Sequence, residues 1–193
     1  SKAVVTFDDA TNATMTAKQI SDIVGAVTSA TITNKVAISG DVSDMTAALV
    51  TAGTSATIGT TGTTATVSDL ATLSEANAIA KINNVTASFT LGLSDSSTAL
   101  TKNATTISDD MAAVTTDQSD IKITVNDAKD ATVSATRLAA IGGATTGDVT
   151  VSSAVKVTDN HDNLTAAFVT TGTKVLATSA VLTVPQLDQQ PDS

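Results

Sequence analysis

The chain contains an internal duplication, and this feature limits the possible folds more than any other. Val5–Ala26 aligned with Ile123–Ala144 gives about nine identities in 22 positions, where this composition would give roughly two or three by chance. Asp44–Thr54 matches Asn163–Thr173 at about seven of 11 positions, and Thr64–Ile82 repeats the theme more loosely. Such repeats are typical of stacked units, each of which buries its apolar face against the next.

Two residue patterns, one typical of strands and one typical of short helices, alternate within the repeat at a spacing of roughly 25 to 30 residues. Some segments alternate β-branched apolar residues with Thr, Ser or Lys, which predicts strands with one buried face; they are Ala30–Ser39, Ala87–Ser94, Ser119–Asp127, Asp148–Asp159 and Val175–Val184. Others place apolar residues three or four apart, as on a short helix, for example Ile20 with Ile23 and Leu164 with Phe168.

These patterns predict a mainly β protein with short helices. We expect a β-solenoid of about six or seven coils, each with one or two short strands and a short helix. A β-sandwich is the alternative, because seven short strands with turn signals would also fit it. The expected repeat domain covers residues 1–184, with related blocks at about 4–60, 61–118 and 119–180, and a polar tail or linker follows at 185–193.

The interior must be filled almost without aromatic side chains. About 38 Thr and 32 Ala stand beside three Phe, and the chain has no Trp, Tyr or Cys. Small and β-branched side chains fill thin, closely spaced layers, so the composition favours narrow coils. The absence of Cys fits an extracellular location, where stray thiols are avoided.

The charge balance excludes several partners. A net charge of -9 with scattered Lys and a single Arg argues against nucleic acid, because phosphate recognition needs clustered basic residues. No apolar run is long enough for membrane insertion, and the first residues lack a signal-peptide pattern. Because the chain begins with Ser1 and not with Met, we expect a processed or excised form.

Enzymatic chemistry has little support in the sequence. His161 is the only histidine, and it lies in the polar link VTDNHDNLT with no Cys available and no Ser marked as its partner. A polysaccharide lyase or hydrolase would need a convergent carboxylate pair or a basic groove, and the sequence places neither. We therefore predict a protein that is not an enzyme, with no catalytic or cofactor-binding residues and no required cofactor.

Asp dominates the charged residues, with about 18 Asp against the single Glu75. Because Asp prefers turns and caps, a fold rich in turns would explain this bias. Calcium is the alternative, since it binds loop carboxylates and amide oxygens, although no EF-hand spacing is present. The candidate metal ligands are Asp8, Asp9, Asn12, Asn126, Asp127, Asp130, Asp159 and Asp162, of which the first three and the next three occupy equivalent repeat positions.

Pairs of Thr two residues apart, such as Thr14 with Thr16 and Thr31 with Thr33, put both hydroxyls on one strand face. Stacked coils would align them in a flat ladder of the kind that binds ice. High β-propensity also explains Thr in strands, so ice binding is a minor alternative.

The segment DATVSATRLAAIGGATTGDVTVSSAVKVTDNHDNLTAAF resembles the Ala/Thr/Val/Asp-rich tandem repeats of large secreted surface and adhesin proteins of cyanobacteria and other aquatic bacteria. It is also similar to segments of phage structural proteins. The resemblance covers about Val5 to Val184 and implies an exported, adhesin-like, sheath-like or surface-layer-like role, often with calcium.

These observations lead to a functional hypothesis. We expect an extracellular, cell-surface or virion-surface structural protein that assembles with itself into a filament, sheath or surface layer, because the strand-like AVVTF begins near one end without a cap. At the other end, PQLDQQPDS suits a linker or an arm that reaches a neighbour. The alternative is an adhesin or phage-fibre module that recognises a surface glycan or receptor.

Overall fold

In a computed structural model, the protein has an α/β fold of seven helices and four small parallel sheets, counted over residues 3–185 without 52, 54 and 174, which are the residues the structure describes. The helices are α1 (Ala17–Val24), α2 (Val42–Leu49), α3 (Leu73–Ala80), α4 (Ser97–Leu100), α5 (Asp109–Asp117), α6 (Ala135–Gly142) and α7 (His161–Phe168). The strands are β1 (Val4–Phe7), β2 (Thr14–Thr16), β3 (Ser29–Ile32), β4 (Ala37–Gly40), β5 (Ala56–Ile58), β6 (Thr63–Val67), β7 (Val85–Phe89), β8 (Leu93–Asp95), β9 (Ile123–Val125), β10 (Val149–Val151), β11 (Lys156–Thr158) and β12 (Val181–Thr183).

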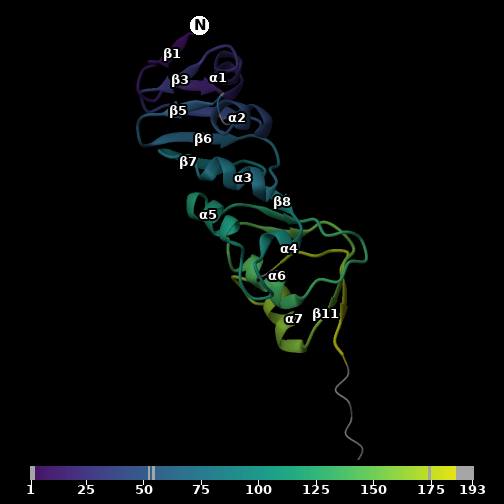
Figure 1. Ribbon diagram of the computed structural model, residues 1–193. Helices are drawn as coiled ribbons and strands as arrows, with labels where there is room; N and C mark the ends of the chain where they lie inside the picture. The colour runs from purple at the N-terminus through teal and green to yellow at the C-terminus, as the bar shows by residue number, and fades with distance from the viewer. Residues whose placement is uncertain (1–2, 52, 54, 174, 186–193) are drawn as a thin grey trace, which may run out of the picture.

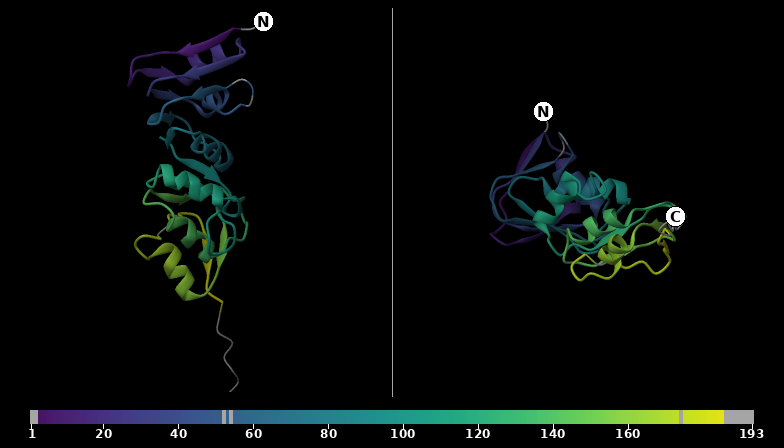
Figure 2. Two further views of the ribbon diagram at one scale, coloured as in Figure 1. Left: turned by 60° about the vertical axis from the view of Figure 1, so that its left-hand side comes forward. Right: turned by 90° about the horizontal axis from the view of Figure 1, so that it is seen from below.

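The chain passes repeatedly through two strands and a helix, and we call each passage a layer. Every pairing between the named strands is parallel, in the orders β1-β3-β5, β2-β4-β6-β7, β8-β9-β10 and β11-β12. Figure 1 shows the strands lying across the long axis, one below another, with the helices stacked beside them. The views in Figure 2 show that the molecule is longest along this stacking direction.

Residues at matching positions form buried columns through the layers. Phe7 pairs with Ile32 and Ile32 with Ile58, all three side chains being buried. Beside this column, Met15, Ile38, Ala65 and Ala87 face each other in successive strands and are at most 8% exposed. Parallel pairing without register shifts therefore lets small side chains fill the interior, as the composition requires.

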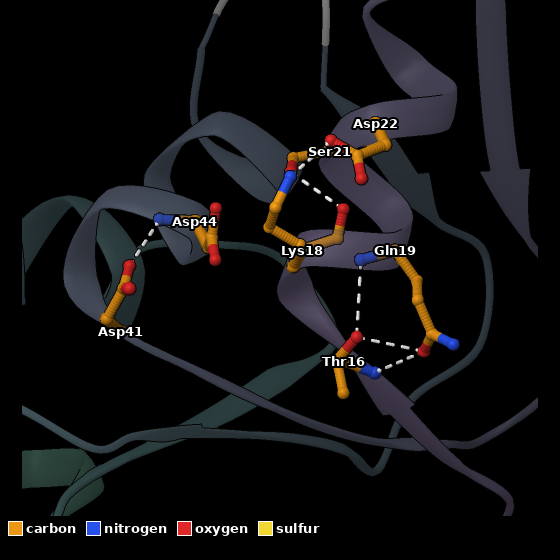
Figure 3. Close-up of polar contacts among 7 residues, drawn as sticks. All are labelled: Thr16, Lys18, Gln19, Ser21, Asp22, Asp41 and Asp44. Carbon is orange, nitrogen blue, oxygen red and sulfur yellow. Dashed lines mark hydrogen bonds and ion pairs between the residues drawn. The ribbon is translucent and has the colours of Figure 1, made fainter.

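The helices form a second packed row. α1 packs against α2, α3 against α5 and α6 against α7, and each helix turns buried residues such as Ile20, Met45 and Leu138 inward. Short polar side chains begin the helices: at α1, Thr16 and Gln19 form a reciprocal capping box (Figure 3). Helices of this length are stable only because they pack on one another and on the strands.

The predicted mainly β solenoid is wrong, because the molecule is α/β. Six of the seven helices have eight or nine residues, whereas no strand exceeds five, and the strands divide into four separate sheets of two to four strands. The apolar spacings that predicted short helices of one or two turns belong to helices such as α1 and α7, which have eight residues each and pack against neighbouring helices. The β-sandwich alternative is also wrong, because its sheets are antiparallel and the pairings here are parallel.

The internal duplication has a structural counterpart. α1 and α6 correspond at a shift of 118 residues, and α2 and α7 correspond at a shift of 119. The hydrogen bond from Ala37 N–H to the Ala13 carbonyl recurs from Lys156 N–H to the Ala131 carbonyl, at 2.8 Å in both places. Related residues therefore build equivalent helices and equivalent turns in both halves. The block limits stay predictions, as does the tail at 185–193, of which 186–193 lie outside the described residues.

Candidate functional site

The first predicted calcium group lies in the loop between β1 and β2. The Asp8 carboxylate accepts hydrogen bonds from Asn34 Nδ2 (3.0 Å) and Thr33 Oγ1 (3.3 Å), and the Asp9 carbonyl accepts a second bond from Asn34 Nδ2 (2.8 Å). Asn12 turns the chain with a φ of 68°. These contacts tie the loop to the next layer, between β3 and β4.

The second group occupies the corresponding loop after β9. Asn126 Nδ2 donates a hydrogen bond to Ser94 Oγ (3.1 Å). The Asp127 carboxylate accepts hydrogen bonds from the backbone N–H (2.9 Å) and the hydroxyl (3.1 Å) of Ser97, the first residue of α4. Asp130 has a φ of 65°, which makes its turn equivalent to that of Asn12.

The third group precedes α7. Asp159 accepts hydrogen bonds from Asn163 Nδ2 (2.7 Å) and Asn160 N–H (2.9 Å). The Asn163 amide is the main cause that lowers the pKa of Asp159 below 3.8, and backbone N–H groups of Asn160 and of the first turn of α6 add to it. Asp162 lies next to His161, with 3.4 Å between Oδ1 and Nδ1, and both side chains are almost fully exposed.

Asp residues at or just after the end of a strand also bond to helices of the preceding layer. In three layers the carboxylate accepts a hydrogen bond from the first backbone N–H of such a helix: Asp69 from Val42 at 2.7 Å, Asp95 from Leu73 at 3.2 Å and Asp127 from Ser97 at 2.9 Å. These N–H groups have no partner within the helix, and a negative charge is favourable there. Much of the Asp bias therefore has a structural role between layers, in addition to local caps such as Asp41 at α2 (Figure 3).

Sequence reasoning missed these contacts between layers because their partners are 22 to 30 residues apart. The available signal was an Asp at or just after the end of a strand in successive repeats. In the part of the chain that the structure describes, no three His, Asp or Glu side chains come together as a metal ion requires. Calcium binding stays a prediction. Of the candidate ligands, Asp130 forms an ion pair with Lys156, with 3.4 Å between Oδ1 and Nζ.

A shallow groove of about 440 Å³ lies between the C-terminal end of α6 and the loop before β10. Its lining includes four glycines together with Thr145, Asp148 and Leu176. Thr145 Oγ1 donates to the Ile121 carbonyl (2.7 Å) and accepts from Gly147 N–H (2.9 Å), so this hydroxyl holds the loop in place. The groove carries no arrangement of groups that points to a particular reaction.

The most distinctive surface lies where the layers end. Leu176, Val181, Leu182 and Val184 are 43%, 58%, 48% and 55% exposed, and we call these four residues the C-terminal end surface. Residues 175–185, VLATSAVLTVP, include no charged side chain, although the chain carries a net charge of -9. Edge strands of other proteins are protected by charges, bulges or prolines within the strand, and β12 has none of these within Val181–Thr183.

Leu182 belongs to a column that is buried elsewhere. It pairs with Val157, which is fully buried, and the related column through β2, β4, β6 and β7 is also buried. In the first half, Ala65 occupies the place of Leu182 and is covered by β7. Leu182 is therefore an inward-facing residue at the last described rung of its sheet.

The last helix shows the same incomplete covering. Val42 at the start of α2 is 6% exposed, whereas the equivalent His161 of α7 is exposed. Val50 after α2 is half-buried, whereas the equivalent Val169 is 69% exposed. α3 packs against α2, and no helix after α7 takes this place within the described residues.

Comparisons with protein-family models, with curated proteins and with solved structures found no match to this chain. The resemblance to bacterial surface repeats and phage proteins therefore remains a prediction. Among the helices described, none has both the length and the apolar character needed to cross a membrane.

Proposed function

We propose that the protein is a non-enzymatic structural protein that assembles with itself through its C-terminal end surface. The observation that carries this proposal is Leu182, which is 48% exposed in a column whose other members are buried. Covering this surface removes apolar side chains from water, at about 25 cal/mol for each Å² of apolar area. A protein with such an end is suited to bind another layer.

The opposite end supports assembly as well. β1 and β2 are the outermost strands of their sheets, and Val4 of β1 is 73% exposed. Two different ends that fit each other produce open chains of subunits instead of closed rings when the contact does not close by rotation. A filament is the simplest such product, and a sheath or surface layer requires lateral contacts between filaments.

An extracellular, cell-surface or virion-surface location belongs to this proposal. Its support is the absence of Cys and the resemblance to exported repeat proteins. The alternative, an adhesin or phage-fibre module for a glycan or receptor, remains a second prediction, with the groove beside α6 as its nearest candidate surface.

Sedimentation velocity over a wide concentration range, followed by negative-stain electron microscopy, tests the proposal. We expect concentration-dependent association of the unmodified protein and loss of association in Leu182→Lys. Leu91→Lys is the matched control, because Leu91 is similarly exposed at 56% but lies in the middle of the stack. A protein that stays monomeric at the highest concentration, or Leu182→Lys and Leu91→Lys proteins that associate equally well, would overturn the proposal.

A further inference from the structure

We propose that copies of this chain join head to tail, with β12 of one copy accepting β2 of the next copy as a parallel strand. The inference rests on the proposed self-assembly and specifies its partner surface and register. The occupant of the C-terminal end surface is thus the N-terminal end of a second copy.

The duplication makes the two ends complementary. At the N-terminal end, β1 lies on β3 and β2 lies on β4. At the C-terminal end, Leu176 lies on β10 and β12 lies on β11. β10 and β11 are the counterparts of β3 and β4. The N-terminal edge is therefore positioned by β3 and β4 and the C-terminal edge by the equivalent pair β10 and β11, so the two edges have the same spacing and direction and face opposite ways along the stack.

In β12, the backbone N–H and C=O of the middle residue, Leu182, point to the open edge, where a further strand could bind them. Alternate residues of a parallel strand point their N–H and C=O groups to opposite sides. Val181 N–H donates to the Val155 carbonyl (2.9 Å) and the Thr183 carbonyl accepts from Asp159 N–H (3.2 Å), so both residues face β11. The backbone groups of Leu182 therefore face the open edge.

In β2, the backbone groups of Thr14 and Thr16 point to the open edge, in the positions that would pair with Leu182. The Ala13 carbonyl accepts a hydrogen bond from Ala37 N–H (2.8 Å), so Ala13 and Met15 face β4 while Thr14 and Thr16 face the open edge. Leu182 N–H can then donate to the Thr14 carbonyl of the next copy, with Met15 opposite Leu182. Thr16 N–H would donate to the Leu182 carbonyl after the Gln19 side chain, now 3.1 Å away, releases it.

The chain already uses this arrangement between β6 and β7. Ala65 holds the place of Leu182, because it pairs with Ile38 as Leu182 pairs with Val157. On its other side Ala65 pairs with Ala87, and the flanking Thr64 pairs with Thr86. The proposed contact repeats this register, with Met15 in the place of Ala87.

The edge strands at both ends carry no charged side chains. β1 and β2, with the sequences VVTF and TMT, contain no charged residue, Pro or Gly, and the same holds for VLT of β12. Exposed edges with uncharged side chains are templates for another strand. A contact between two different surfaces leaves a free β12 and a free β2 at the ends of every oligomer, so growth continues.

Crosslinking between cysteine variants tests the register, because the chain has no Cys of its own. Thr14→Cys and Val181→Cys proteins carry affinity tags of different size and are mixed before treatment with a short bismaleimide. The register places these two positions opposite each other, so we expect at least tenfold more of the mixed product than of either homodimer. Thr116→Cys, on the exposed side of α5 in the middle of the stack, replaces Thr14→Cys in the control mixture.

The outcomes separate this inference from the proposed function. Association in the ultracentrifuge together with a Val181→Cys homodimer as the main product would overturn the head-to-tail contact and leave self-assembly intact. Association with equal crosslinking in the Thr14→Cys and Thr116→Cys mixtures would also overturn it. A protein that stays monomeric and gives no mixed product would overturn both.

Discussion

Asn12 and Asp130 hold the same left-handed turn in the two related halves, with φ of 68° and 65°. The N–H of Asn12 donates to the Lys35 carbonyl (2.7 Å), and that of Asp130 donates to the Ala154 carbonyl (2.8 Å). Asn and Asp tolerate this conformation better than other residues with a side chain. The same backbone conformation and the same hydrogen bond to the next layer therefore occur in both halves.

Replacement of Asn12 tests the importance of this turn. We expect Asn12→Ala to lower the free energy of unfolding by about 1 kcal/mol, because Ala is strained at positive φ. Asn12→Gly should be close to neutral, because Gly adopts this conformation freely. Urea denaturation measures both variants, and equal stabilities for Ala and Gly would contradict the backbone argument.

The contact from Asp127 to Ser97 is expected to contribute to stability. Asp127→Ala leaves the first N–H of α4 without its carboxylate, and we expect the free energy of unfolding to fall by roughly 1 to 3 kcal/mol. Asp120→Ala is the control, because this Asp is exposed and should change stability by less than about 0.5 kcal/mol. Thermal and urea unfolding of both variants give the comparison, and equal losses would remove the assigned role of Asp127.

Gly92 and Gly53 form a matched pair at positive φ, at 83° and 79°. A Cβ at Gly92 would collide with the backbone carbonyl of Lys122, whereas nothing lies within 4 Å of one at Gly53. We expect Gly53→Ala to cost about 1 kcal/mol from backbone strain alone and Gly92→Ala to cost at least twice as much. Similar unfolding curves for the two variants would contradict this expectation, because they would mean that the backbone at Lys122 moves away from Gly92 at little cost.

The lowered pKa of Asp159 predicts a dependence of stability on pH. A carboxyl group with a lowered pKa in the folded state stabilises the fold above its unfolded pKa, near 3.8, and this contribution is lost as the pH falls through the folded pKa. Asn163→Ala removes the main cause, so the pKa of Asp159 should rise towards its ordinary value. Carbon-13 NMR titration of the carboxyl groups measures the change, and an unshifted Asp159 signal would contradict it.

Some features of the fold could be read from local sequence. The duplication, the strand texture and the apolar spacing of the helices depend on residues near one another in the chain, and the Ala- and Thr-rich composition favoured thin layers. Ala30–Ser39, predicted as one strand, forms β3 and β4 with a turn between them. The predicted fold class was wrong because the spacing of apolar residues predicts short helices but does not show that these helices pack together as a second row.

The candidate surface depended on the tertiary structure. From sequence, Leu182 is one apolar residue in a strand pattern, like Ala65 or Val157. Its exposure follows from which strand lies next in the stack, a relation between segments more than 20 residues apart. The acidic residues behaved likewise, since the carboxylate of Asp127 is explained by Ser97 of the preceding layer.

The repeat, the net negative charge of the chain, the uncharged segment at 175–185 and the kinds of side chain available to the interior all follow from the amino-acid sequence alone. The parallel order of the strands, the partners of the Asp residues and the apolar surface at the end of the stack become visible only in the folded chain. The physical reason is that composition and periodicity act over a few residues, whereas register and burial depend on contacts between whole layers.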